Sequence, residues 1–329
     1  MLKKQSRDIR FLGIECVYQS YGRKEPILRR PSLAIALEKL ADQIQSNGVL
    51  KEPYLKNRLC VGLRRIVFSE DHSTATLLWA GGDSDAVDPC FWDADSDAAR
   101  TEEAQSGERV AVSCHMVISL TETPSNKYIA VKEEVPILSN GLLQRFFNHL
   151  LKEYAYDSLQ DPDKKEKPFK AYPSVSLDTL ASKTIAEALT GKIPFMVEAV
   201  SVTKGQKRQD ENFSVDRETK KLALKPVNGW ELPVFIKNLT ALLPTIKTYD
   251  EVYIRYKDAK KKQSSLNFEM KELEGCDLET CLFAQRLTLS LNASIGQFSD
   301  DVHSELEKKM RENVILEHNK LVKKFNESS

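Results

Sequence analysis

The sequence has no long hydrophobic run. Its longest apolar stretch lies within AVSCHMVISL and is far shorter than the roughly 18 to 20 residues that a membrane-spanning helix needs. The N-terminal residues MLKKQSRDIRF also lack the apolar segment of a secretory signal. Hydrophobic residues make up 41% of the 329 residues and charged residues 29%, which is typical of a soluble globular protein of about two domains. We therefore expect a cytoplasmic protein.

Cysteine is scarce and scattered. None of the 6 cysteines forms a C-x-x-C pair, whereas a structural zinc site needs four converging nitrogen or sulfur ligands. Cys114 and His115 are adjacent, so in a strand they point to opposite faces and cannot bind one metal ion. We interpret the cysteines as buried free thiols and expect neither a metal site nor a cofactor.

Common catalytic and nucleotide-binding motifs are absent. There is no G-x-S-x-G, HExxH, Walker-type or G-x-G-x-x-G sequence. The aspartates of DADSD resemble the beginning of a calcium loop, but Ala98 and Ala104 stand where that loop needs glycine and glutamate. We assign no catalytic residue, and the balance is against an enzyme. A metal-dependent nuclease, with carboxylates that converge only in the fold, is the enzyme alternative.

The net charge of zero conceals a segregation of charge along the chain. Residues 1–66 contain 14 lysines and arginines against 6 acidic residues, whereas residues 67–109 contain 11 acidic residues against 2 basic ones. A polyanion meets the local charge of a surface and not the total, so the first segment predicts a basic face. We hypothesise that the acidic loop at 83–106 mimics nucleic-acid phosphates and shields this segment.

Hydrophobic periodicity predicts an N-terminal α+β domain over residues 1–155. A strand at 11–18 precedes a helix that begins after Ser32 and ends near Gly48. A hairpin follows, then the acidic loop, two more strands and a second helix. This order, βαββββα, is typical of an antiparallel sheet covered by helices.

The polar tract 156–168 is the predicted linker to a second domain at 169–295. There the pattern predicts the order βαββαβ, with its first helix at 176–190, which is the order of a ferredoxin-like fold. The segment RLTLSL fits a strand or a helix equally well. Residues 296–329 contain a predicted amphipathic helix, which we expect to pack on its own domain in preference to a second copy. The predicted fold class is therefore α+β, with two antiparallel-sheet domains and a C-terminal helix.

Basic residues gather in several turns, hairpins and strands of this prediction. Cations there could neutralise phosphates, and an aromatic side chain on a sheet face could stack on an unpaired base. The alternative is that the lysines only keep an edge hairpin soluble. The predicted nucleic-acid-binding residues are Arg29, Arg30, Arg64, Arg65, Lys204, Lys207, Arg208, Tyr253, Arg255, Lys257, Lys260, Lys261 and Lys262.

A longer pattern joins several of these segments. The strand FLGIECVYQSYGRKE leads through a basic loop to SLAIALEKLA, and a later helix ends in FFNHLLKEY. The last third contains ELPVFIKNLTALL, then YDEVYIRYKDAKKKQSSLNFEM and a charged C-terminal helix. In this order the chain resembles the RexA-like phage-exclusion proteins, without a diagnostic motif and without a counterpart for the acidic loop. The resemblance implies a cytoplasmic DNA-binding protein that signals infection to a partner, often a membrane protein encoded nearby.

The sequence therefore predicts a nucleic-acid-binding protein with little sequence preference, in anti-phage defence by abortive infection or in another mobile-element function. We expect a homodimer that binds single- or double-stranded DNA, with a membrane or effector protein as a further partner. Two alternatives stay open. One is the metal-dependent nuclease, and the other is a non-catalytic interaction subunit of a defence complex.

Overall fold

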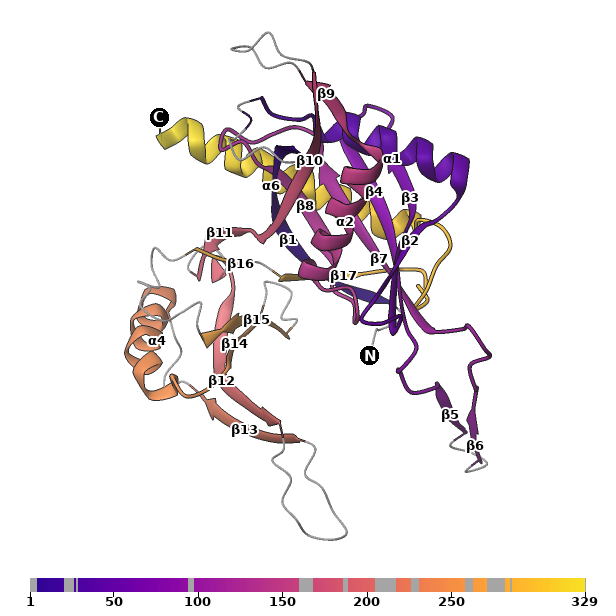
Figure 1. Ribbon diagram of the computed structural model, residues 1–329. Helices are drawn as coiled ribbons and strands as arrows, with labels where there is room; N and C mark the ends of the chain where they lie inside the picture. Colours follow the sequence, from indigo (N-terminus) through magenta and orange to yellow (C-terminus); the bar gives the residue numbers. More distant parts are fainter. Residues whose placement is uncertain are drawn as a thin grey trace. The chain divides into compact units, whose positions relative to one another are not determined.

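The computed structural model describes residues 5–20, 27, 29–93, 98–159, 168–185, 189–204, 217–225, 231–257, 263–270, 282–284 and 286–328. This part of the chain is α+β, with sheets of antiparallel strands and a long C-terminal helix, as the sequence predicted (Figure 1). It forms two compact units. Unit 1 combines Met1–Thr179 with Leu287–Ser329, and unit 2 is Leu180–Arg286.

The core of unit 1 is one large sheet with the strand order β2-β3-β4-β7-β8-β1-β10-β9, in which β17 also pairs with β1. The long strand β1 pairs antiparallel with β8 along one edge and with β10 along the other. The strands are β1 (Ser6–Ser20), β2 (Leu50–Tyr54), β3 (Leu59–Phe68), β4 (Thr74–Asp83), β7 (Val110–Ser119), β8 (Tyr128–Glu133), β9 (Asp157–Leu159), β10 (Phe169–Thr179) and β17 (Arg286–Ser290).

Helices α1 (Leu33–Asn47) and α2 (Asn140–Tyr154) cover one face of this sheet. Each begins at a serine whose hydroxyl accepts a backbone N–H of the first turn, Ser32 for α1 and Ser139 for α2. Phe146 and Phe147 of α2 pack edge-on against the ring of Trp79, which is fully buried in β4. This aromatic cluster lies at the centre of the larger hydrophobic core.

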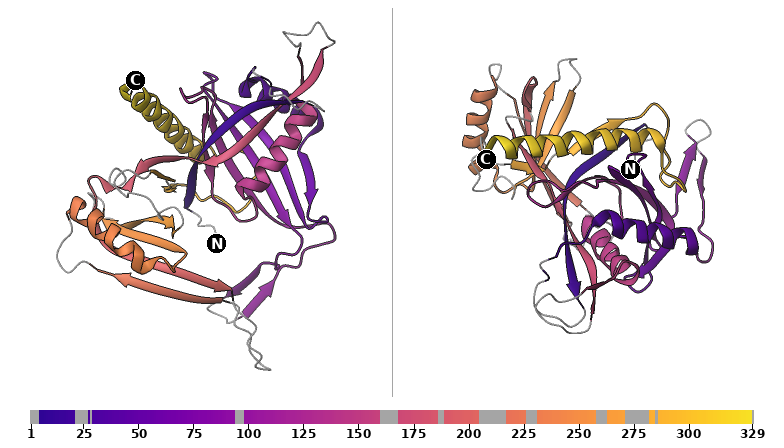
Figure 2. Two further views of the ribbon diagram at one scale, coloured as in Figure 1. Left: turned by 60° about the vertical axis from the view of Figure 1, so that its left-hand side comes forward. Right: turned by 90° about the horizontal axis from the view of Figure 1, so that it is seen from above.

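Helix α6 (Ser304–Ser328) covers the opposite face of the same sheet, over β7 and β8 (Figure 2). Leu306, Met310 and Val314 are fully buried there, at the four-residue spacing that the sequence shows. Side chains alternate along β7, so that Cys114 lies in the core beneath α1 and α2 while His115 faces the α6 side. The C-terminal helix therefore packs on the sheet of unit 1.

Unit 2 is built on a four-stranded antiparallel sheet of order β13-β12-β14-β15. Helix α4 (Leu232–Ile246) packs on one face, where Phe235, Ile236 and Leu239 contact the apolar residues of β12 and β14. A two-stranded sheet of β11 and β16 completes the described part. The strands are β11 (Ala181–Thr184), β12 (Ile193–Lys204), β13 (Arg217–Leu224), β14 (Glu251–Lys257), β15 (Gln263–Glu269) and β16 (Leu282–Ala284).

The ferredoxin-like order predicted for the second domain is not confirmed. The predicted helix at 176–190 is wrong over much of its length, because β10 continues to Thr179 and β11 occupies 181–184. Val175 and Leu177 alternate with polar residues in β10, and the exposed edge of β1 pairs with this stretch, so tertiary pairing outweighs local helical preference. The segment RLTLSL, left open by the pattern, is strand β17.

The boundary between the units differs from the predicted linker at 156–168. Strands β9 and β10 belong to unit 1, and the chain enters unit 2 only after Thr179. Within the acidic loop, strands β5 (Cys90–Asp93) and β6 (Ala98–Thr101) form a small hairpin that periodicity did not indicate. Among the described helices, none has the length and apolarity needed to cross a membrane.

Candidate nucleic-acid interface

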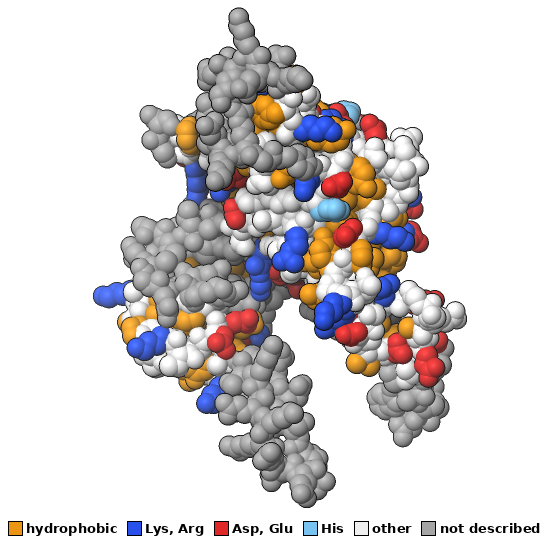
Figure 3. All heavy atoms as spheres, in the orientation of Figure 1, with side chains coloured by type: hydrophobic (Ala, Val, Ile, Leu, Met, Phe, Trp, Pro, Cys, Tyr) orange, Lys and Arg blue, Asp and Glu red, His pale blue; other side chains and the backbone are white. Residues whose placement is uncertain are grey.

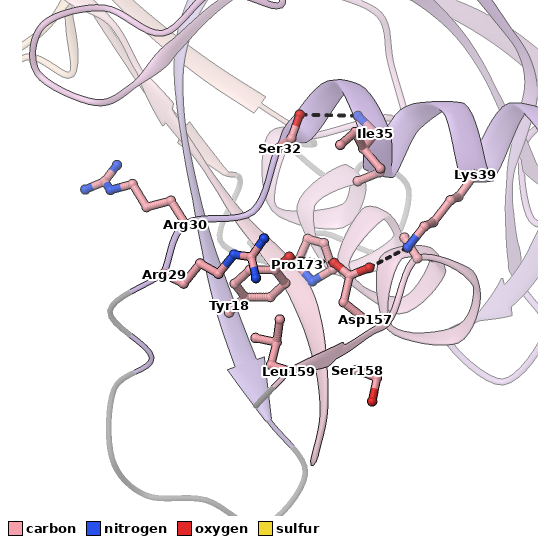
Figure 4. A pocket seen from close by; sticks show the side chains of 12 residues that line it. Tyr18, Arg29, Arg30, Ser32, Ile35, Lys39, Asp157, Ser158, Leu159 and Pro173 are labelled. Carbon is pink, nitrogen blue, oxygen red and sulfur yellow. Dashed lines mark hydrogen bonds and ion pairs between the residues drawn. The ribbon is translucent and has the colours of Figure 1, made fainter. Parts of the chain in front are cut away.

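A pocket of about 290 Å³ in unit 1 lies where α1 begins, between the ends of β1, β9 and β10. Arg29 and Arg30, both predicted to bind phosphate, lie in the loop before α1 and line this pocket. Lys39, two turns into α1, and Tyr18, near the end of β1, are on its wall (Figure 4). The loop therefore places the arginine pair beside a third cation that the sequence analysis did not select.

Asp157 is the acidic side chain that organises the pocket. Lys39 Nζ donates to Asp157 Oδ1 at 2.6 Å, and the Tyr18 hydroxyl donates to Asp157 Oδ2 at 2.5 Å. Arg29 lies beside the Tyr18 ring, whereas the Arg30 guanidinium points away from the centre and donates to the carbonyl of Asn126 (Figure 4). The pocket thus has three cationic side chains against one carboxylate among its lining residues.

These contacts set the protonation states in the pocket. Burial raises the pKa of Asp157, but hydrogen bonds from Lys39 and Tyr18 outweigh it and hold that pKa below its ordinary value. Burial and the hydrogen bond to Asp157 raise the pKa of Tyr18. At neutral pH the carboxylate is therefore charged and the phenol is a neutral donor. An entering anion meets a positive pocket with a hydroxyl on its wall.

Two of the pocket residues could have been found in the sequence. Lys39 follows Ser32 by seven residues, which places it on the same face of α1 two turns from the helix start. Tyr18 lies near the end of the strand that leads into the basic loop. Asp157 gave no such signal, because the sequence placed it in a linker, while the structure places it in the edge strand β9.

The second predicted cluster, Arg64 and Arg65, lies in β3 and is paired with acidic residues. Arg64 forms an ion pair with Asp300 and stands over the ring of Phe298, 5.0 Å from its centroid. Arg65 Nε lies 2.5 Å from Asp301 Oδ1. Unlike the pocket, this cluster has one carboxylate for each cation.

Tyr253, Arg255 and Lys257 share one face of β14, as predicted, because Val252, Ile254 and Tyr256 alternate with them and face the core. Arg255 Nε lies 2.6 Å from Glu198 Oε2, and Lys221 Nζ lies 2.7 Å from Glu198 Oε1. Burial raises the pKa of Glu198, but these two partners bring it below its ordinary value.

Acidic and aromatic neighbours also engage the other two members of this face. The Tyr253 hydroxyl donates to Glu251, and Lys257 Nζ stands 5.6 Å from the centroid of the Phe195 ring. The face of β14 is therefore less cationic than its own sequence indicates. The side chain of Lys204, and residues Lys207, Arg208, Lys260, Lys261 and Lys262, lie outside the described part of the structure.

A buried charged network lies on the α6 side of the sheet. Glu133 Oε1 lies 2.6 Å from Arg7 Nε, and Glu133 Oε2 lies 2.9 Å from His115 Nδ1. All three side chains are at most 2% exposed. His115 Nε2 accepts the backbone N–H of His303, so the ring proton is on Nδ1. Arg7 Nη2 also donates to the carbonyls of Ile295 and Gly296. Arg7 and His115 thus hold the segment before α6 and Glu133 binds both of them, which indicates a structural role.

Several carboxylates that a nuclease site could use are paired with arginines. Glu133 is committed to this network, and Asp83 pairs with Arg58 at the end of β4, close to Asp85. Over the described ranges, no three His, Cys, Asp or Glu side chains lie together as a metal site would require.

Cys16 and Cys114 are buried free thiols, as predicted, and Cys60 is a half-buried free thiol. Burial raises the pKa of the Cys114 thiol to about 12.

On the face of unit 1 drawn in Figure 3, lysine and arginine side chains lie among acidic and apolar ones. The distinguishing feature of the Arg29–Arg30 pocket is therefore its excess of cations in a concave site.

No family model matches the sequence, and no curated protein matches it either. A proposal for function consequently rests on the chemistry of the site and on the pattern of the sequence.

Proposed function

We propose that this protein binds nucleic acid through the phosphate backbone, with little sequence preference, and that the pocket of Arg29, Arg30 and Lys39 is a phosphate contact. The observation that carries the proposal is that Arg29, Arg30 and Lys39 line a concave site whose lining contains one carboxylate, that of Asp157. Guanidinium and ammonium groups bind phosphate oxygens by charge-assisted hydrogen bonds, which do not depend on the base.

The wider setting of the proposal comes from the sequence pattern. The resemblance to RexA-like phage-exclusion proteins supports a role in anti-phage defence, in the cytoplasm, with DNA as the nucleic acid. It also supports signalling to a membrane or effector protein, and we propose that the protein acts as a homodimer. Binding to DNA is the part of this proposal that the pocket makes testable first.

The test is fluorescence anisotropy with labelled single-stranded and duplex DNA of one length at about 50 mM salt. The variant Arg29→Ala/Arg30→Ala removes two cations from the pocket. We expect its affinity to fall at least tenfold, because one hydrogen bond to a charged group contributes about 1.5 kcal/mol or more and about 1.4 kcal/mol is a tenfold change in affinity.

Arg10→Ala/Arg58→Ala is the matched control. It removes two arginines that lie outside the pocket and are each already paired with a carboxylate, Arg10 with Glu134 and Arg58 with Asp83. We expect this control to bind DNA as the wild type does. Equal weakening by both variants would reduce the proposal to non-specific attraction by total charge, and wild-type affinity in the pocket variant would refute it.

A further inference from the structure

The arginines of β3 face the same side of the sheet because the strand is irregular there. Neighbouring residues of a regular strand point to opposite faces. In β3, the register against β4 shifts between Leu63 and Arg65, which inserts one extra residue. Leu63 and Ile66 both pack in the core beneath α1 and α2, so Arg64 and Arg65 both point to the α6 side. The bulge thus creates a double cation that a regular strand could not present.

A short acidic strap, residues 297–303, meets this double cation. Asp300 pairs with Arg64 and Asp301 with Arg65, one carboxylate for each guanidinium. The aspartate side chains are 76% and 72% exposed, and the Arg65 side chain is 54% exposed. Ion pairs this exposed are individually weak and are screened by salt. Another anion of higher charge density can therefore compete for the arginines.

Backbone contacts fix the strap on both sides of the aspartates. Before them, Ser113 N donates to the carbonyl of Gln297 at 3.0 Å, and Ser299 N donates to the Ser113 hydroxyl at 3.0 Å. After them, His303 N donates to the buried His115 ring at 3.1 Å. The two carboxylates are consequently held beside the arginines at high effective concentration, whereas only their own side chains must turn away to uncover the cations.

We propose that Arg64 and Arg65 form a second phosphate-binding site, and that Asp300 and Asp301 of the acidic strap mask it as internal counter-ions. The ligand is the nucleic-acid backbone, and this identity rests on the proposed function. The masking itself rests on the bulge and the paired side chains, and it is independent of the Arg29–Arg30 pocket. In the wild type the strap lowers DNA affinity, and a change that moves the aspartates raises it.

The test uses the full-length variant Asp300→Asn/Asp301→Asn in the same anisotropy assay, with single-stranded DNA at several salt concentrations. We expect several-fold tighter binding and a log–log salt slope steeper by about 1.5, since two more phosphates are neutralised on a single strand. Adding Arg64→Ala/Arg65→Ala to this variant removes the cations and should abolish the gain. Circular dichroism and the urea midpoint establish that each variant is folded.

Glu70→Gln/Glu312→Gln is the matched control, because it removes two exposed carboxylates elsewhere in unit 1 and changes the net charge equally. A gain in this control equal to that of the strap variant overturns the inference, as does a gain that survives loss of Arg64 and Arg65, or no gain at all. If the strap variant binds in an Arg64- and Arg65-dependent way while Arg29→Ala/Arg30→Ala has no effect, the inference stands and the pocket proposal fails. If Arg29→Ala/Arg30→Ala weakens binding and the strap variant shows no gain that depends on Arg64 and Arg65, the inference fails and the pocket proposal stands.

Discussion

At the scale of single residues, the environment of each cation decides what it does. Arg29 lines a pocket with excess positive charge, Arg64 has its own aspartate, and Arg7 is buried in a network with Glu133 and His115. The sequence predicted the first two as equivalent. They differ because the acidic partner of Arg64 is Asp300, which is far away in the sequence and could not be paired with it by pattern.

Arg7 and Arg10 both lie in β1, but the Arg7 side chain is buried and the Arg10 side chain is partly exposed. Arg7→Met leaves the buried Glu133 carboxylate without its cation and should lower the free energy of unfolding of unit 1 by about 3–5 kcal/mol. Arg10→Met breaks the partly exposed pair with Glu134, three residues further along the same strand, and should lower it by under about 1 kcal/mol.

Urea unfolding followed by tryptophan fluorescence measures both effects. In a Trp230→Phe background the remaining tryptophans, Trp79 and Trp92, belong to unit 1. Similar losses for the two variants would show that Arg7 and Glu133 contribute no more than a surface pair.

At the scale of elements, local pattern predicted the parts whose core contacts repeat. Helices α1, α2 and α6 were found from apolar residues three and four apart, and β14 from alternation. The end of β10 was predicted as a helix because its partner β1 cannot be seen in a local window. The bulge in β3, which turns Arg64 and Arg65 to one side, likewise depends on pairing with β4.

The anchoring of α6 predicts a pH dependence of stability. Hydrogen bonds from Lys309 and from the backbone N–H groups of Asn292 and Ala293 lower the pKa of Glu305 from 4.5 to about 2. A carboxyl with a depressed folded-state pKa stabilises the fold above its unfolded pKa, and this contribution is lost as the pH falls. The window for Glu305 is therefore from about pH 4.5 down to about pH 2.

We expect Glu305→Gln to lower the melting temperature at pH 7, with a deficit that shrinks below about pH 4.5 and vanishes near pH 2. Thermal unfolding over this pH range, with Glu312→Gln on the same helix as the control, measures the difference. A Glu305→Gln deficit of constant size from pH 7 to pH 3 would mean that the carboxylate does not anchor α6.

At the scale of the whole molecule, unit 2 is an insertion into an edge of the unit 1 sheet. Strand β10 ends with Thr179 opposite Leu12 of β1. The chain returns as β17, where Thr288 contacts Asp8 and the next residues reach Gln5. Both β10 and β17 run in the direction opposite to β1: β10 lies along the later residues of β1, and β17 lies along its first residues. The two strands therefore occupy successive stretches of one edge, and unit 2 joins their ends.

This arrangement predicts which deletions unit 1 tolerates. Replacing residues 180–286 by a short Gly-Ser linker should leave a cooperatively folding unit, because β17 and α6 are retained. Ending the chain at Thr179 removes α6 with Leu306, Met310 and Val314, exposes the sheet face that they cover, and should leave an unfolded or aggregated product. Circular dichroism and size-exclusion chromatography distinguish the products. Equal behaviour of the two deletions would contradict the insertion.

The measurement that tests the central claim most directly is the salt dependence of duplex DNA binding by the wild type and by Arg29→Ala/Arg30→Ala. With about six phosphate contacts, the wild-type log–log slope should be about −5, and the pocket variant should be shallower by about 2. Arg10→Ala/Arg58→Ala should keep the wild-type slope, since both arginines lie outside the pocket and are already paired with carboxylates. An unchanged slope in the pocket variant, or wild-type binding that ignores salt, would contradict phosphate binding at this pocket.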